Sequence, residues 1–66
     1  GNNMKTPKTN KVLVAFTHND QDKNWYPATV DASLSIQFTA TYKVGKETKH
    51  GHFYFYKDRN ITWKDT

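Results

Sequence analysis

The chain contains no cysteine, so it has no disulfide bond, no thiolate metal ligand and no cysteine nucleophile. Glycine and proline are scarce, with three and two residues among 66, and no glycine-rich phosphate-binding loop is present. A chain this short buries only about 60% of the surface that it exposes when unfolded, so its core must be small and dense. The sequence predicts one domain whose core depends on aromatic residues, which make up 15% of the chain.

Long hydrophobic segments are missing as well. The longest uninterrupted apolar run covers residues 12–16, which is far too short to span a membrane. We therefore expect a soluble protein without a membrane partner, and we favour an intracellular location. Residues 1–10 contain no branched aliphatic and no aromatic residue, so we expect a flexible basic tail before a domain at 11–66. Gly1–Asn3 precede Met4 in the manner of a cloning remnant.

No group of residues points to catalysis. Ser33 and Ser35 have no evident base nearby, and the carboxylates fall mainly in predicted turns rather than in facing pairs. His50 and His52 could share one face of a strand, but a zinc site usually needs four converging ligands. We expect a binding protein that is not an enzyme and that holds no metal and no cofactor.

Alternation of polar and apolar residues is the clearest structural pattern in the chain, and it runs from residue 33 to residue 44. A period of two residues over this length predicts a long, bent strand with one buried and one solvent-exposed face. The residues expected to be buried are Leu34, Ile36, Phe38 and Ala40, with Ser35, Gln37 and Thr39 on the opposite face.

Four shorter segments, at 12–16, 25–30, 52–56 and 61–63, complete a predicted all-β fold. Pro27 cannot donate a ladder hydrogen bond, so we expect it at a sheet edge or a bulge. Polar turns are predicted at 45–51, which has a glycine at each end, and at 57–60. Five strands with a long central one favour an SH3-like small barrel. An OB-like barrel is the alternative, and a single sheet that dimerises is a third arrangement.

Basic residues outnumber acidic ones by ten to six, which gives a net charge of +4 and an isoelectric point near 9.5. Such a balance attracts phosphate, although a charge of this size is also ordinary for a soluble surface. The candidate phosphate contacts lie in or beside the two predicted turns: Lys43, Lys46, Lys49, His50, Lys57 and Arg59. Lysines at such places also keep sheet edges from aggregating.

Tyr54 and Tyr56 alternate with Phe53 and Phe55, so the phenylalanines and the tyrosines are expected on opposite faces of a strand. Exposed tyrosines beside lysines can stack on unpaired bases, although cross-strand aromatic pairs also stabilise sheets. The sequence therefore predicts a module that binds nucleic acid, either DNA or RNA, as a monomer or weak dimer. A protein or peptide partner is the second hypothesis.

Three segments resemble the first strands of Tudor domains, which are SH3-like barrels of the same general kind as Agenet and chromo-barrel modules. They read Val-Ala-Phe at 14–16, Trp-Tyr-Pro-Ala-Thr-Val at 25–30 and Ala-Thr-Tyr-Lys-Val-Gly at 40–45. Tudor readers surround a methylated cation with aromatic faces. The resemblance implies a cage of Phe16, Tyr26 and Tyr42, with Trp25 beside it.

Two positions depart from the pattern of a methyl-arginine reader. Val44 stands where many readers have a further aromatic residue, and Lys46 places an ammonium where they have a polar amide. We therefore expect an incomplete cage. The alternative function is a Tudor-like interaction module, either a reader of methylated lysine or arginine or a small inhibitor of a host protein.

Overall fold

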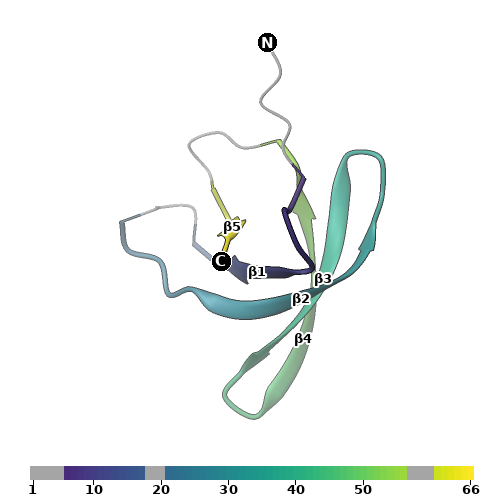
Figure 1. Cartoon of the computed structure of the whole chain (residues 1–66). Helices are drawn as coiled ribbons and strands as arrows, with labels where there is room; N and C mark the ends of the chain where they lie inside the picture. The colour runs from purple at the N-terminus through teal and green to yellow at the C-terminus, as the bar shows by residue number, and fades with distance from the viewer. Residues whose placement is uncertain (1–5, 18–20, 57–60) are drawn as a thin grey trace.

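The structure is a computed structural model that describes residues 6–17, 21–56 and 61–66. These residues form one antiparallel sheet of five strands and no helix, which confirms the all-β prediction. The strands are β1 (Lys11–Val14), β2 (Tyr26–Ser33), β3 (Gln37–Val44), β4 (Glu47–Tyr54) and β5 (Trp63–Asp65), in the order β4-β3-β2-β1-β5 (Figure 1). Within the described residues the sheet is not closed into a barrel, because no ladder joins β4 to β5. The same residues include no helix long and apolar enough to cross a membrane.

The long alternating segment is divided between two strands. β2 ends at Ser33, β3 begins at Gln37, and the Leu34 N–H donates to the Gln37 carbonyl oxygen at 2.7 Å across the turn between them. Leu34 and Ile36 are each 55% exposed, so the prediction that they are buried is wrong. The physical reason is that residues 34–36 turn the chain away from the core, and alternation in sequence does not reveal where a strand reverses. Phe38 and Ala40 are fully buried, as predicted.

The hairpin between β3 and β4 is tighter than predicted. Val44 pairs directly with Glu47, so only Gly45 and Lys46 form the turn. Gly45 has a φ of 62°, and a positive φ at the first of two central residues is typical of a type II′ turn with glycine there. The prediction of a turn over 45–51 is wrong, because residues 47–51 belong to β4.

Gly51 lies inside β4, at a position where the ring of Phe53 leaves no room for a side chain. A Cβ atom added at Gly51 would lie 2.8 Å from Cε2 of Phe53 and 3.3 Å from Cε1 of Tyr42. Both rings are buried, so neither can move aside freely. The second glycine of the predicted turn is therefore a packing residue.

Pro27 is exposed at the second position of β2, which is an interior strand. The irregularity in β2 lies between Val30 and Ala32, so Pro27 occupies neither an edge nor a bulge, and that prediction is wrong. The ladder between β2 and β3 begins one residue later, at Ala28 and Tyr42. The missing N–H of Pro27 therefore removes no bond from that ladder.

Two residues before β1 contact the sheet. The Lys8 N–H donates to Asp65 Oδ1 at 2.9 Å, and the Asn10 carbonyl oxygen accepts from Val30 N–H at 2.8 Å. The predicted turn at 57–60 lies outside the described residues.

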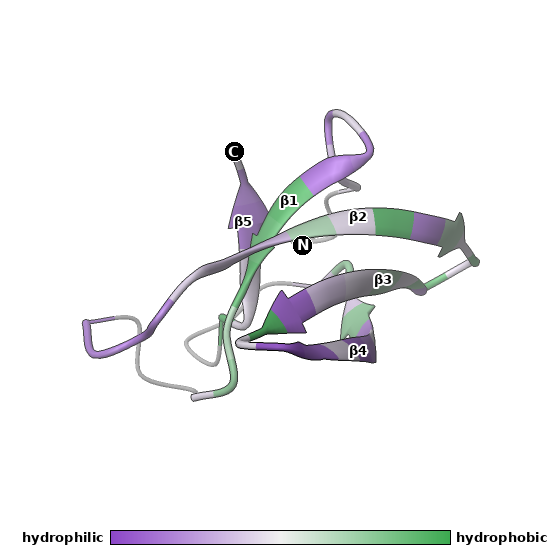
Figure 2. Ribbon diagram, turned by 90° about the horizontal axis from the view of Figure 1, so that it is seen from below, coloured by the Kyte–Doolittle hydropathy of each residue, from purple (hydrophilic) through white to green (hydrophobic). Residues whose placement is uncertain are grey.

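The core covers one face of the sheet, and hydrophobic and hydrophilic residues alternate along β2 and β3 (Figure 2). Phe38 lies at its centre. Its ring centroid is 5.1 Å from that of Trp63 in an edge-to-face contact, 5.5 Å from that of Phe53 and 5.9 Å from that of Phe55. A cluster of aromatic rings thus supplies most of the buried surface of a small domain.

Trp63 joins the two edges of the sheet. β4 and β5 are the outermost strands, yet the Nε1–H of Trp63 in β5 donates to the carbonyl oxygen of Tyr54 in β4 at 2.7 Å. The sheet must therefore curl around the core until its edges come within reach of one side chain.

We predict that Phe38→Ala destabilises the fold by about 3–5 kcal/mol, because it opens a cavity among three other rings. Phe16→Ala is the matched control, since Phe16 is 52% exposed and its loss should cost less than about 1.5 kcal/mol. Urea denaturation monitored by tryptophan fluorescence measures both. Equal losses of stability in the two variants would remove Phe38 from the centre of the core.

Gly51→Ala should destabilise the fold by about 1–3 kcal/mol, because the added Cβ must displace the Phe53 ring. Thr48→Ala, at an exposed position of the same strand, is the control and should change the stability by less than about 0.5 kcal/mol. The same denaturation experiment compares them. If Gly51→Ala is as stable as Thr48→Ala, the Phe53 ring does not lie over position 51.

Candidate nucleic-acid interface

The face of the sheet opposite the core, called here the outer face, is polar and basic. Residues that pair across antiparallel strands point to the same side, so the register identifies its members. They are Lys11, Leu13, Pro27, Thr29, Ala32, Gln37, Thr39, Thr41, Lys43, Thr48, His50, His52, Tyr54 and Lys64. These positions carry three lysines, two histidines and no carboxylate.

The hairpin divides its predicted basic residues between two faces. Lys43 and His50 lie on the outer face, because they pair with Thr48 and Thr41. Lys49 pairs with the buried Tyr42 and so lies on the core side, where its Nζ is 2.9 Å from Oε2 of Glu47. The predicted turn over 45–51 concealed this separation, because it treated the first half of β4 as irregular.

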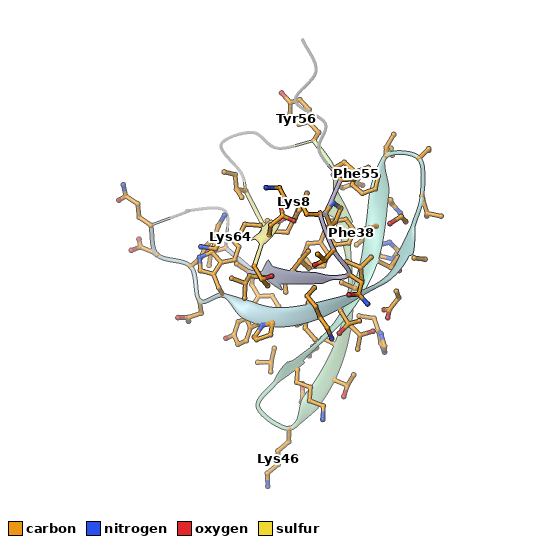
Figure 3. The ribbon with its side chains drawn as sticks, viewed as in Figure 1. Lys8, Phe38, Lys46, Phe55, Tyr56 and Lys64 are labelled. Atoms are coloured by element: carbon orange, nitrogen blue, oxygen red, sulfur yellow. The ribbon has the colours of Figure 1, made fainter. Side chains whose placement is uncertain are left out.

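The remaining predicted contacts lie at the margins of the sheet or outside the described residues. Lys46 sits at the tip of the hairpin and points away from the sheet (Figure 3). Tyr54 lies on the outer face and is 58% exposed, while Tyr56 follows the end of β4 and is exposed as well. Lys57 and Arg59 are outside the described residues.

Two residues of this face were missed by the sequence analysis. Lys11 and Lys64 reach it because their neighbours Val12 and Trp63 point into the core. Trp25, which the resemblance placed beside the cage, instead lies next to Lys64, whose Nζ is 4.3 Å from its ring centroid. Alternation around Val12 and Trp63 was the available signal for the two lysines, but only the β1–β5 pairing places them on one surface.

A second ammonium lies near the same indole ring. Lys23 Nζ is 5.1 Å from the ring centroid of Trp25, and it is buried without a hydrogen-bond partner among the described residues. The aromatic face supplies electrostatic stabilisation to a cation in such surroundings.

The register aligns four residues in a row across the middle of the outer face, called here the polar row: Lys11, Thr29, Thr41 and His50. Lys11 Nζ donates to Thr29 Oγ1 at 3.2 Å. Thr41 Oγ1 donates to Oδ2 of Asp31 and lies 3.0 Å from His50 Nδ1. Asp31 comes from the irregular part of β2 between Val30 and Ala32.

These contacts fix the proton positions on the two histidines. A hydroxyl carries a single proton, so when Thr41 donates to Asp31 it must accept from His50 Nδ1–H. The neutral His50 ring then offers Nε2 as an acceptor. His52 has the opposite arrangement, because its Nδ1 lies 3.3 Å from the Gln37 Nε2 donor and so must accept.

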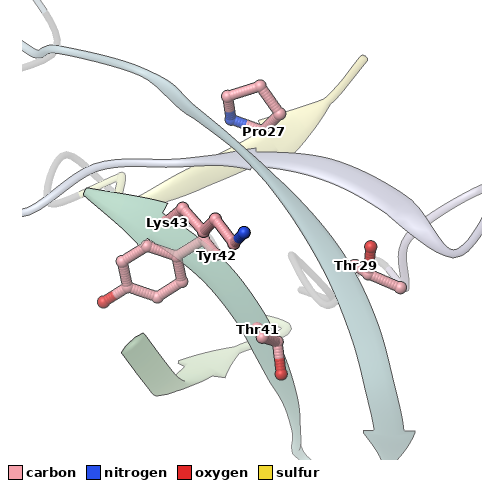
Figure 4. A pocket seen from close by; sticks show the side chains of 5 residues that line it. All are labelled: Pro27, Thr29, Thr41, Tyr42 and Lys43. Atoms are coloured by element: carbon pink, nitrogen blue, oxygen red, sulfur yellow. The ribbon is translucent and has the colours of Figure 1, made fainter. Parts of the chain in front are cut away.

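An open hollow of about 380 Å³ lies beside the polar row (Figure 4). Its lining residues are Pro27, Thr29, Thr41, Tyr42 and Lys43. One proline, two threonines, a tyrosine and a lysine of β2 and β3 therefore surround the hollow.

The residues of the implied aromatic cage are only partly brought together. The ring centroid of Phe16 is 5.2 Å from that of Tyr26 and 5.7 Å from that of Tyr42. Trp25 is not in this cluster, since it lies against Lys64 on the outer face. Phe16 therefore contacts both tyrosines, and three of the four residues named by the resemblance lie together.

Neither a metal site among the described residues nor a match to a known protein helps to assign a function to the outer face. No group of three or more histidine, cysteine or acidic residues in the described part of the chain could hold a metal ion. A comparison of the chain with protein-family models, curated proteins and solved structures found no match. A proposal of function therefore rests on the charge and geometry of the outer face.

We predict opposite neutral tautomers for the two histidines, with the proton on Nδ1 in His50 and on Nε2 in His52. Long-range ¹H–¹⁵N correlation spectra recorded at alkaline pH distinguish the two forms directly. Thr41→Val removes the acceptor of His50 Nδ1–H and should release His50 without changing His52. An Nε2–H form of His50 in the wild-type protein would contradict the polar row.

Proposed function

We propose that this protein binds nucleic acid, DNA or RNA, through the outer face of its sheet. The observation that supports this most is the register, which places Lys11, Lys43 and Lys64 on one surface with two histidines. The carboxylate of Asp31 is bonded to that surface, where it accepts from Thr41. A surface of this charge attracts polyanions, and each phosphate contact adds affinity that does not depend on sequence.

The spacing of the lysines suits an extended strand. Lys43 and Pro27 line the same hollow, Pro27 pairs with Leu13, and Leu13 pairs with Lys64. Three strand-to-strand intervals from β3 to β5, at about 4.8 Å each, separate the backbones of Lys43 and Lys64 by roughly 14 Å. The two ammonium groups can therefore contact different phosphates of one bound strand.

Aromatic side chains favour unpaired bases as part of the ligand. Tyr54 is exposed on the outer face, and Trp25 lies beside Lys64 near the opposite edge. Stacking on such rings contributes about 1–3 kcal/mol per base and needs bases that are free of pairing. We therefore expect single strands to bind more tightly than duplexes.

The proposed fold is an SH3-like, Tudor-like barrel that is open between its edge strands. The return of β5 to β1 and the bond from Trp63 to Tyr54 support this proposal, because together they bring the two edges face to face. The barrel proposal concerns the fold alone, since unrelated functions share such architectures.

A Tudor-like reader is the second candidate function. The convergence of Phe16, Tyr26 and Tyr42 favours it, because the resemblance implies these three walls. A methylated cation would, however, approach a protein of charge +4. Nucleic acid is the better match to the charge.

The salt dependence of binding distinguishes phosphate contacts on the outer face from contacts made by other lysines of the hairpin. With contacts from Lys11, Lys43 and Lys64, the slope of log K against log [salt] should be about −2.1 on a single strand. Replacing Lys43 and Lys64 together with alanine should reduce it to about −0.7. Replacing Lys46 and Lys49 removes the same charge from elsewhere on the hairpin and should leave the slope near its wild-type value.

Fluorescence anisotropy with a labelled oligonucleotide gives these slopes. Equal effects of the two double variants would show that net charge, not the outer face, sets the affinity. A larger effect of the Lys46 and Lys49 pair would place the site at the hairpin tip. If the wild-type protein binds no oligonucleotide at low salt, the proposed function fails and a search for protein partners comes next.

A further inference from the structure

We infer that the hollow between β2 and β3 is a phosphate subsite, which holds one phosphate group between Lys43 and Thr29, with Lys11 bonded to Thr29 beside it. The inference rests on the proposed function, since it names the part of the outer face that would grip a strand. It predicts more than a diffuse charge, because it specifies which hydroxyl and which ammonium groups meet one phosphate.

The hydrogen-bond inventory of the hollow favours an anion. Thr29 Oγ1 already accepts from Lys11 Nζ, so the hydroxyl proton of Thr29 is free to donate. Lys11 keeps two further N–H groups, and Lys43 has three and forms no ion pair among the described residues. Thr29 and Lys43 line the hollow, and Lys11 is bonded to Thr29 from the neighbouring strand, so a phosphate in the hollow can accept hydrogen bonds from this group of donors.

Thr41 lines the hollow and binds the carboxylate of Asp31. Its hydroxyl proton goes to Asp31 and its oxygen accepts from His50, so Thr41 has no proton left for a ligand. Asp31 is not among the residues that line the hollow. The lining therefore holds donors and no carboxylate, which is the reverse of what a cationic ligand requires.

Pro27 indicates that the phosphate belongs to a nucleotide strand. Its ring is exposed on the lining of the hollow, and its strand partner Leu13 is half-buried on the same face. The carbon atoms of a sugar can pack on these apolar groups while the adjoining phosphate contacts Lys43. Inorganic phosphate would use the donors without using Pro27.

Thr29→Val tests the subsite without changing the charge or the approximate volume of the side chain. We expect its affinity for a single-stranded oligonucleotide to fall by about 3- to 10-fold, with an unchanged salt slope. Thr39→Val is the control, because Thr39 is a half-buried threonine on the same face outside the hollow. Its affinity should stay within about 2-fold of the wild type.

Thr29→Ser keeps the hydroxyl and should bind nearly as well as the wild type. If the serine variant is as weak as the valine variant, the hydroxyl does not hold the ligand and the subsite is overturned. The ¹H–¹⁵N spectrum of each variant shows whether it is folded, and the serine variant keeps the test decisive where valine disturbs the strand.

Titration with inorganic phosphate separates the subsite from the proposed function. We expect shifts of the Thr29, Thr41 and Lys43 amides in the wild type and their loss in Lys43→Ala. Such shifts without oligonucleotide binding would uphold the subsite and contradict the proposed function. If oligonucleotide binds with equal affinity to Thr29→Val and Thr39→Val, the proposed function is upheld and the subsite is overturned. If the protein binds neither phosphate nor oligonucleotide, both proposals are overturned.

Discussion

The indole ring of Trp63 makes the two contacts that hold the curled sheet around its core. Its edge meets the face of Phe38 with ring centroids 5.1 Å apart, and its Nε1–H donates to Tyr54 at the far edge of the sheet. One side chain thereby packs against the central ring of the core and holds the two sheet edges together. A chain of 66 residues without disulfides needs such a double contribution, because the surface that it can bury is small.

The curl of the sheet around these rings decides which side chains are available for binding. The large buried rings fill the inner face, where even a Cβ at Gly51 would collide with Phe53. Outward positions have no core to fill, so lysine, threonine and histidine occupy them at little cost in stability. Under the proposed function, stability and ligand binding are carried by opposite faces, and a substitution such as Lys43→Ala should alter binding without unfolding the protein.

The sequence was sufficient for the fold class and for the buried positions Phe38 and Ala40, because alternation directly reports which side of a strand faces the core. It failed at the two turns. Polar and apolar residues alternate through residues 34–36, although the chain turns there. Gly51 was interpreted as the end of a turn, whereas glycine is needed there because of the Phe53 ring. The site depended on the same information: Lys43 separates from Lys49 only once the register is known, and Lys11 joins Lys64 only through the pairing of β1 with both neighbours.

Asp31 poses the remaining physical question, because a carboxylate opposes the binding of phosphate on a basic face. Its contact with Thr41 offers an explanation. By taking the proton of Thr41, the carboxylate makes that hydroxyl an acceptor, which fixes His50 with Nδ1–H inward and Nε2 available to a donor of the ligand. Exposed charges at the surface interact weakly in water, by about 1 kcal/mol or less, so the loss of attraction is modest. In the proposed complex, this directed acceptor beside the phosphate subsite would distinguish a nucleotide, which has amino and hydroxyl donors, from a simple anion such as sulfate, which has no such donors.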